Sequence, residues 1–406
     1  MWRDSDFRRL WAGQTASQLG EQTSLVILPL IAVVALHVDA GQLGVLRAVG
    51  QAPQLLLALF AGVWVDRWQS RTVMVLADLG RALALGTLLV IAGVGGAGLL
   101  TLLIVGFVVG ALSVMFDVAY QTSLVRLVPR QHLLRGNSAI EGSRSAAQLG
   151  GPALGGVLTS LLPGLTAVAL PLLFFLGSVV ALTRIQHRER VPPRTADPAR
   201  VHRQIHGGLR FVAGHSLLRT VCLASAAFQL SYAALMTAFL LFLPRVLHLP
   251  GTAIGLVLAA AGLGALLGSL LAARLPSRLG YGPVLVAAAA IGNGAMLCIP
   301  AVRGNSTLAV AALVAINLTF GALSQLVNVT IMAVRQAITP PRLQGRTAAT
   351  ITFVGMGTTP LGALLGGYLT AHLGTRPALL ITAAGLMLSP LTMVVSPLGR
   401  LGRSVD

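Results

Sequence analysis

Three polar side chains share one face of the first long apolar stretch of this chain. Gln14, Gln18 and Glu21 follow one another at spacings of four and three residues, which aligns them on a helix. No residue three or four positions from Glu21 is basic. Because a carboxyl alone in a medium of low dielectric constant holds its proton more readily, we predict that Glu21 is the proton-coupling residue. Two alternatives stay open: Glu21 binds a cationic substrate directly, or it is permanently protonated and bonds a neighbouring helix.

Two pairs of opposite charges lie near the ends of later apolar stretches. Asp78 with Arg81, and Glu141 with Arg144, are each three residues apart, so each pair shares a helix face. Asp117 lies near the same end of its own stretch. Buried ion pairs are weak evidence for stability and better evidence for a switch. We therefore predict that these residues form a gate at the cytoplasmic end of the apolar stretches. Static pairing between helices is the alternative.

The composition is that of a polytopic membrane protein. Of 406 residues, 55% are apolar and 10% are charged, whereas a soluble protein carries about 25% charged residues. The mean hydropathy is +0.83. All 29 basic residues are arginine, most of them in short connections, so the net charge of +18 does not indicate nucleic-acid binding. These numbers exclude a soluble enzyme.

Cofactor chemistry is not expected. Without lysine the chain has no phosphate-binding loop of the Gly-x-x-x-x-Gly-Lys type. Cys222 and Cys298 lie inside apolar stretches, and the eight histidines are scattered. We therefore expect no metal, no cofactor and no enzymatic activity.

Apolar stretches long enough to cross a bilayer predict an all-α protein with twelve transmembrane helices in two groups of six. The first group is expected near residues 10–36, 43–65, 73–95, 98–120, 139–162 and 165–183. The second group is expected near residues 217–243, 253–275, 282–302, 306–334, 347–371 and 376–396.

Arginine placement predicts the orientation of these helices. The connections on one side hold two or three arginines each, whereas those on the other side hold only Arg245, Arg303 and Arg376. Since positive charge accumulates on the cytoplasmic side, we expect both termini in the cytoplasm. The arginine- and proline-rich residues 185–216 are expected to form a cytoplasmic linker between bundles at 1–184 and 217–406. Its residues 199–212 are expected to form an amphipathic helix on the anionic leaflet, with a solvated tether as the alternative for the first half.

The two groups of six resemble one another at an offset near 210 residues. Gln14, Gln18 and Glu21 correspond to Ser225, Gln229 and Tyr232 at a constant offset of 211, and Phe116-Asp117-Val118 matches Val327-Asn328-Val329. Two parallel halves that each contribute a polar stripe predict a transporter with a central cavity. The residues expected to line that cavity are Gln14, Gln18, Glu21, Gln51, Gln229, Tyr232, Asn317, Gln325 and Asn328.

The connection at residues 62–71 carries a motif of a known superfamily. Gly62, three further residues, Asp66-Arg67 and then Arg71 resemble the loop signature of the major facilitator superfamily. By this resemblance Gly62, Asp66, Arg67 and Arg71 join Asp78, Arg81, Asp117, Glu141 and Arg144 in the cytoplasmic gate. The second-half copy, from Gly268 to Arg274 and Arg278, has no acid.

Further motifs resemble particular branches of that superfamily. Gly151-Pro152-Ala153-Leu154-Gly155-Gly156 is similar to the antiporter motif, although Ala147 stands where a glycine is often seen. Gly151, Pro152, Gly155 and Gly156 are therefore expected to act as this motif. The stretches at 7–11 and 207–211 resemble the enterobactin-exporter-like and macrolide-efflux-like branch of drug:proton antiporters. The resemblance covers essentially the whole chain.

These observations predict a proton-coupled secondary transporter that works by alternating access. By resemblance, it exports a drug-like amphiphile or a siderophore-type metabolite; an importer of a small nutrient, proton-coupled or uncoupled, is the main alternative. Residues 198–405 contain no Asp or Glu, so carboxylate-based coupling must use the first half. A monomer in a bacterial cytoplasmic membrane is expected, with the lipid bilayer, protons and a small molecule as its partners and no nucleic acid.

Overall fold

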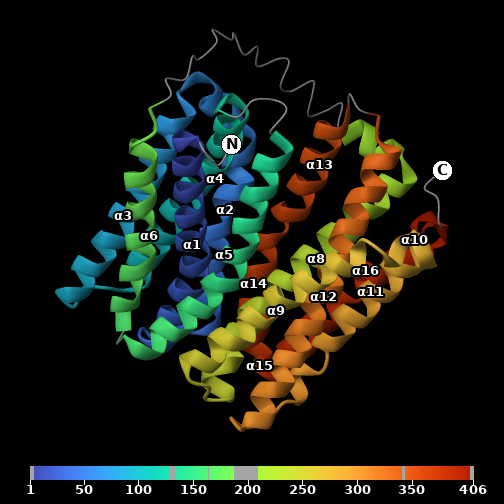
Figure 1. The fold of residues 1–406 in the computed structure, drawn as a ribbon. Helices are drawn as coiled ribbons and strands as arrows, with labels where there is room; N and C mark the ends of the chain where they lie inside the picture. The colour runs from blue at the N-terminus through green and yellow to red at the C-terminus, as the bar shows by residue number, and fades with distance from the viewer. Residues whose placement is uncertain (1–3, 128–132, 163, 187–208, 341–342, 403–406) are drawn as a thin grey trace. The chain divides into compact units, whose positions relative to one another are not determined.

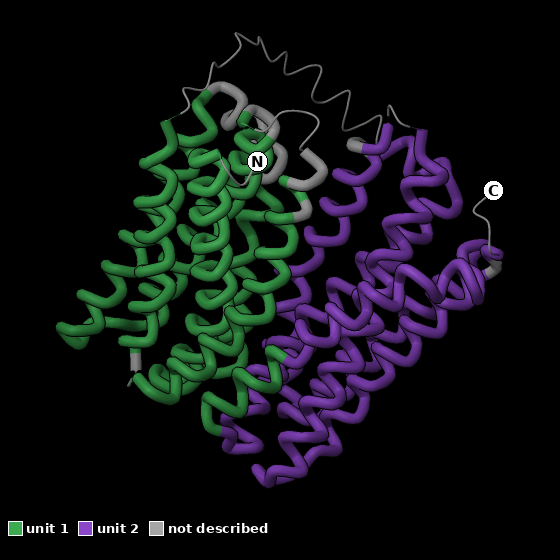
Figure 2. The backbone as a smooth tube through the Cα atoms, viewed as in Figure 1, with its two compact units in different colours: residues 1–195, 250–259 green, residues 196–249, 260–406 purple. Residues whose placement is uncertain are grey.

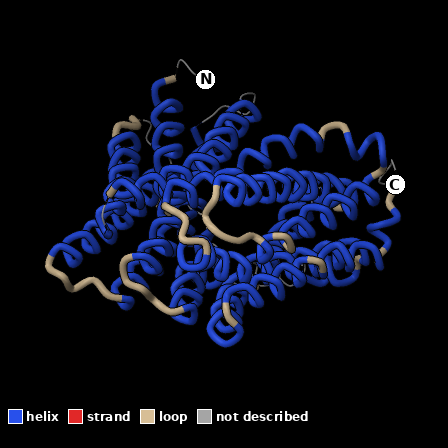
Figure 3. The backbone as a smooth tube through the Cα atoms, turned by 90° about the horizontal axis from the view of Figure 1, so that it is seen from below, coloured by secondary structure: helices blue, strands red, loops and turns tan. Residues whose placement is uncertain are grey.

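The computed structural model of the chain describes residues 4–127, 133–162, 164–186, 209–340 and 343–402. In these ranges every regular element is a helix (Figure 3). The chain divides into two compact units, shown in different colours in Figure 2. Unit 1 comprises residues 1–195 and 250–259, and unit 2 comprises residues 196–249 and 260–406.

The described residues of unit 1 form six complete α-helices, which are labelled in Figure 1. They are α1 (Ser5–Val34), α2 (Ala40–Arg67), α3 (Ser70–Gly93), α4 (Leu99–Leu127), α5 (Leu133–Leu161) and α6 (Ala169–Thr183), with the 3₁₀ turn η2 (Gly164–Val168) before α6. Helix α1 packs against α5 and α6, and α4 packs against α2 and α3.

Unit 2 has more and shorter elements. They are α8 (Ser216–Leu241), the π-helical turn η3 (Phe242–Val246), α9 (Gly251–Ala272), α10 (Leu275–Leu279), α11 (Tyr281–Met296), η4 (Ile299–Ala301), α12 (Thr307–Ile338), α13 (Gln344–Gly357), α14 (Thr359–Leu373), α15 (Thr375–Leu386), α16 (Leu388–Val395) and η6 (Pro397–Arg400). Helix α8 packs against α14 and α15, and α11 packs against α12. The first residues of α9 belong to unit 1.

Local sequence explains where several helices begin and end. Asp39 and Gln42 cap α2 reciprocally: the Asp39 carboxylate accepts from the Gln42 amide at 2.7 Å, and the Gln42 side chain accepts from the Asp39 amide at 2.9 Å. Helix α13 ends three residues before Pro360, and α15 ends shortly before Pro390. Because proline lacks an amide hydrogen and disfavours helix in the residue before it, two expected single helices are each divided in two.

Ten helical segments within the described residues are long and apolar enough to cross a membrane. They fall in the expected stretches, whereas α2 and α5 are helical but are not among the ten. Helix α5 contains Arg135, Glu141 and Arg144, which lower its hydropathy. The count of twelve spans and the position of the termini therefore stay predictions. Residues 187–208 of the expected linker lie outside the described residues, and of the expected amphipathic helix only 209–212 are described, as helix.

The repeat predicted at an offset of 211 is visible in the packing of each unit. Three pairs of residues at that offset are fully buried in both units: Met74 and Leu285, Leu85 and Met296, and Leu102 and Leu313.

One close helix contact recurs at the same offset. A Cβ at Gly110 of α4 would overlap the Gly50 carbonyl oxygen of α2, and a Cβ at Gly321 of α12 would overlap the Ala261 carbonyl oxygen of α9. The two units therefore use the same backbone-to-backbone contact between their second and fourth long helices.

Candidate functional site

Arg81 of α3 is the largest fully buried side chain of unit 1. Its guanidinium forms a salt bridge with Asp78 and donates to Ser17 Oγ at 2.9 Å and to Ser113 Oγ at 3.1 Å. The rings of Phe116 and Phe175 lie 4.8 Å and 4.5 Å from it. A buried guanidinium with partners from α1, α3 and α4 and two aromatic faces is held in one position.

Glu21 of α1 faces this guanidinium. Its Oε2 lies 3.8 Å from Arg81 Nη1 and, among the described residues, accepts no hydrogen bond. The expectation that Glu21 stands alone is therefore wrong: its counter-charge comes from another helix, which spacing along α1 could not reveal. Asp78 also forms a salt bridge with Arg81, and this contact is shorter than the one between Glu21 and Arg81.

Asp117 of α4 completes a charged group inside unit 1. Its carboxylate accepts a hydrogen bond from Gln18 Nε2 at 3.3 Å. Arg144 of α5 is close enough to attract both Asp117 and Glu21. We call Glu21, Asp78, Arg81, Asp117 and Arg144 the charge cluster. It contains three carboxyl groups and two guanidinium groups.

The remaining residues of the expected gate are not brought together in the same way. Glu141 is exposed and lies near enough to Arg144 to attract it, but no salt bridge joins the two in the described part of the chain. Arg71 donates from Nε to the Leu182 carbonyl at 3.1 Å and from Nη2 to the Thr183 carbonyl, so it satisfies the free end of α6. Gly62, Asp66 and Arg67 lie in the last turns of α2, and their side chains are outside the described residues.

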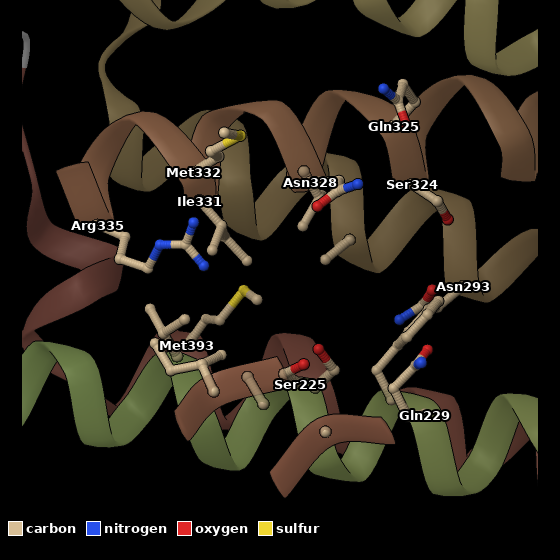
Figure 4. Close-up of a pocket in the computed structure, with 18 of the residues that line it drawn as sticks. Ser225, Gln229, Asn293, Ser324, Gln325, Asn328, Ile331, Met332, Arg335 and Met393 are labelled. Carbon is tan, nitrogen blue, oxygen red and sulfur yellow. The ribbon is translucent and has the colours of Figure 1, made fainter. Parts of the chain in front are cut away.

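Unit 2 contains a cavity of about 480 Å³ (Figure 4). Among its lining residues are Ser225, Phe228, Gln229, Ala289, Asn293, Ser324, Gln325, Asn328, Ile331, Met332, Arg335, Thr352, Gly355 and Met393. Gln229, Gln325 and Asn328 were expected at the substrate cavity. Within the described residues the side chains of these three amides form no hydrogen bond, so they are available to a ligand. We call this space the unit 2 cavity.

The other residues expected at a substrate cavity do not line this one. Tyr232 stacks against Phe228 and Phe320, with ring centroids 5.6 Å and 5.4 Å away. Asn317 donates to the Leu313 carbonyl of its own helix at 2.9 Å. Gln14 is fully buried with an amide that bonds no described residue, and Gln51 is half-buried in α2.

The repeat relates the unit 2 cavity to the charge cluster. The cavity residues Ser225, Phe228, Gln229, Ala289, Ser324 and Asn328 lie 211 positions after Gln14, Ser17, Gln18, Asp78, Ser113 and Asp117. Thus two carboxylates of unit 1 are replaced by alanine and asparagine. Arg81 itself corresponds to Gly292, so the bulkiest member of the cluster is also absent from unit 2.

Sequence analysis missed two features of the unit 2 cavity. Ser324 could have been found from the repeat, because it corresponds to Ser113. The helix expected at 306–334 ended just before Arg335, but α12 continues to Ile338 and places Arg335 inside the helix.

The antiporter-like motif of α5 forms close contacts within unit 1. A Cβ at Gly151 would overlap Gln22 of α1, and a Cβ at Gly156 would overlap Gly255 at the start of α9. Gly155 lies against Val26, and Pro152 is inside the helix. No group of three His, Cys, Asp or Glu that could hold a metal ion occurs among the described residues.

Relatives of this chain include efflux pumps. It is 26% identical over 392 residues to the multidrug efflux pump Tap of Mycobacterium tuberculosis, covering 93% of this chain and 90% of the relative. It is 25% identical to the Tap pump of Mycolicibacterium fortuitum, covering 96% and 94%.

Solved transporters share the fold. A bacterial homologue of the iron transporter ferroportin in an inward-facing state has a TM-score of 0.78 at 17% identity, covering 96% of this chain and 98% of that chain. A bacterial homologue of the lysosomal transporter Spinster has a TM-score of 0.75 at 14% identity, covering 97% and 96%.

A family model described as transmembrane secretion effector matches residues 2–404, essentially the whole chain. The motif at residues 62–71, the repeated helix contacts and this match agree. The chain belongs to the transmembrane secretion effector family of the major facilitator superfamily, and it is a multi-pass membrane transporter.

Proposed function

We propose that the chain is a proton-coupled exporter that works by alternating access. The observation that carries this proposal is the charge cluster: three carboxyl groups share two guanidinium groups inside unit 1, while residues 198–405 contain no acid. In this proposal the chain has twelve spans in two six-helix halves, both termini are cytoplasmic, and a monomer acts in a bacterial cytoplasmic membrane.

The net charge of the charge cluster favours the binding of one proton. With all groups ionised, its three carboxylates and two guanidiniums sum to one negative charge. A net charge in an apolar medium is costly, and the binding of one proton removes this net charge. Glu21 is the acceptor, because its Oε2 lacks a hydrogen bond within the described residues and keeps only a long contact with Arg81.

Arg81 couples this proton to helix movement. Deprotonated Glu21 attracts Arg81, whereas protonated Glu21 leaves Arg81 to Asp78. A proton therefore changes the force between α1 and α3, and a difference between two states is what a transport cycle needs. The wider gate of Gly62, Asp66, Arg67 and Arg71 stays a prediction. Glu141 is left out of it, because its side chain is exposed and forms no salt bridge with a described residue.

The substrate class follows from the relatives and from the unit 2 cavity. Tap proteins are named multidrug efflux pumps. The cavity combines an aromatic ring and methionines with carboxamides, which suits a drug-like amphiphile or a siderophore-type metabolite. Import of a small nutrient through the same fold is the alternative, since rocking of two halves does not fix the direction.

Proteoliposomes test the proposal. A pH gradient is imposed, and the movement of a zwitterionic rhodamine dye is recorded with and without a protonophore. Wild-type protein should accumulate the dye on the acidic side only while the gradient lasts. Glu21→Gln should lose this accumulation but still exchange labelled for unlabelled dye across the membrane.

Glu141→Gln is the matched control, because it makes the same change at an exposed carboxyl. It should behave as the wild type. Accumulation by Glu21→Gln equal to wild type would contradict coupling through Glu21, and wild-type transport that ignores the gradient would favour the uncoupled alternative.

A further inference from the structure

Among the described residues that line the unit 2 cavity, Arg335 is the one that carries a charge. It lies in the last turn of α12, and Figure 4 shows its guanidinium turned into the cavity, on the side of Met393. The nearest labelled neighbours on its own helix are Ile331 and Met332, which are apolar. A cation in such a place needs a counter-charge.

The described residues of unit 2 supply no such counter-charge. No described residue forms a salt bridge with Arg335, and residues 198–405 contain no Asp or Glu at all. The polar groups of the cavity are neutral: the carboxamides of Gln229, Asn293, Gln325 and Asn328 and several hydroxyl groups. Arg81 of unit 1, by contrast, is paired with two carboxylates.

The repeat shows that the fold does not require an arginine here. The residue 211 positions before Arg335 is Leu124, which is 1% exposed in the apolar core of unit 1. A leucine therefore satisfies the packing at this position of the bundle. In unit 2 the same position opens onto the cavity and carries a charge, which indicates a role in binding.

We propose that the unit 2 cavity takes an amphiphile with a carboxylate, and that Arg335 binds the carboxylate. Gln325 and Asn328 hydrogen-bond the polar part of the same molecule, and Phe228 packs on its ring. This inference rests on the proposed function for the direction of transport but not for binding. It narrows the substrate class from amphiphiles in general to anionic or zwitterionic ones.

Two dyes that differ in one group test this inference. One is a rhodamine with a free benzoate, and the other is the methyl ester of the same dye. Binding of each to the purified full chain in phosphatidylcholine nanodiscs is titrated by fluorescence polarisation. Wild-type protein should bind the free acid more tightly than the ester.

Arg335→Gln should weaken binding of the free acid about tenfold and change binding of the ester less than twofold, because it removes one charge-assisted hydrogen bond. Arg335→Lys should restore part of the loss. Arg219→Gln removes an exposed arginine of α8 that does not line the cavity, and it should change neither dye. Equal loss of both dyes, or no loss of the free acid, would overturn the inference, as would a wild type that prefers the ester.

Nanodiscs with phosphatidylglycerol separate a solute carboxylate from a lipid phosphate. If phosphatidylglycerol abolishes free-acid binding in the wild type but leaves the residual binding of Arg335→Gln unchanged, a lipid headgroup takes the site and the inference is overturned. Unchanged binding supports it. These titrations need no proton gradient, so failure of proton coupling and failure of carboxylate binding are seen separately.

Discussion

The charge cluster of unit 1 and the unit 2 cavity occupy related positions of one repeat, yet the first is a group of paired charges and the second is a cavity without an acid among its described residues. Asp78 and Arg81 correspond to Ala289 and Gly292, and Asp117 corresponds to Asn328. Shortening or neutralising these side chains leaves a space of about 480 Å³ lined by amides. One bundle architecture thus offers a set of titratable groups in one half and a binding cavity in the other.

This comparison assigns different tasks to the two halves. In the proposed function, proton binding belongs to unit 1, because the acids are there, and selection of the substrate belongs to unit 2, because the cavity is there. Variants in unit 1 should leave substrate binding unchanged, and variants in unit 2 should leave proton coupling unchanged.

The largest effect is expected on breaking the charge cluster at its centre. Arg81→Gln leaves Asp78 buried without its cation, which should cost about 3–5 kcal/mol of stability. Thermal unfolding in detergent, followed by tryptophan fluorescence, measures this. The double variant Arg81→Gln with Asp78→Asn removes both charges and should recover most of the loss. A single variant as stable as wild type would show that the pair is not buried as described.

A smaller effect is expected at the repeated helix contact. Gly110→Val and Gly321→Val each force a side chain against a backbone carbonyl, and overpacking of this kind costs about 1–3 kcal/mol. Because the contact recurs in both units, the two variants should lower the unfolding temperature by similar amounts. A loss at one position alone would contradict the structural equivalence of the two contacts.

A third variant gives the unit 2 cavity the chemistry of unit 1. Asn328→Asp restores the carboxylate found at Asp117, close to the cavity that holds Arg335. The free-acid rhodamine should bind about tenfold more weakly and its methyl ester no less tightly, because a hydrogen bond to charge is replaced by repulsion. Polarisation titration measures both. Asn328→Ala, which adds no charge, should weaken both dyes alike.

The smallest effect is expected at Glu141. Its carboxyl is exposed and forms no salt bridge with a described residue, so Glu141→Gln should change stability by less than about 0.5 kcal/mol. Transport of the zwitterionic rhodamine dye should remain within twofold of wild type. A tenfold loss of transport at unchanged stability would return Glu141 to the gate.

Sequence reasoning succeeded where one helix or the repeat carries the information. Spacing along α1 placed Gln18 and Glu21 on one face, and the offset of 211 led to Gln229 and Asn328, which line the cavity. The apolar stretches led to helices in each expected range, because the length of a span is set by the bilayer.

Sequence reasoning failed where the partner of a side chain lies on another helix, or where the position of a helix end determines the surroundings of a residue. Arg81 is the counter-charge of Glu21, and no spacing along the chain shows that α3 brings it there. Arg71 bonds the last carbonyls of α6, a contact that spacing along the chain does not show. The expected helix at 306–334 ended just before Arg335, whereas α12 includes it.

One measurement tests the central claim most directly: proton and dye fluxes recorded together in the same proteoliposomes. An internal pH dye and the free-acid rhodamine are followed for wild type, Glu21→Gln and Arg335→Gln. The account predicts that Glu21→Gln exchanges dye without moving protons, whereas Arg335→Gln moves less free-acid dye but keeps the wild-type ratio of protons to dye. If Arg335→Gln changes that ratio, or if Glu21→Gln keeps it, the division of tasks between the two units is wrong.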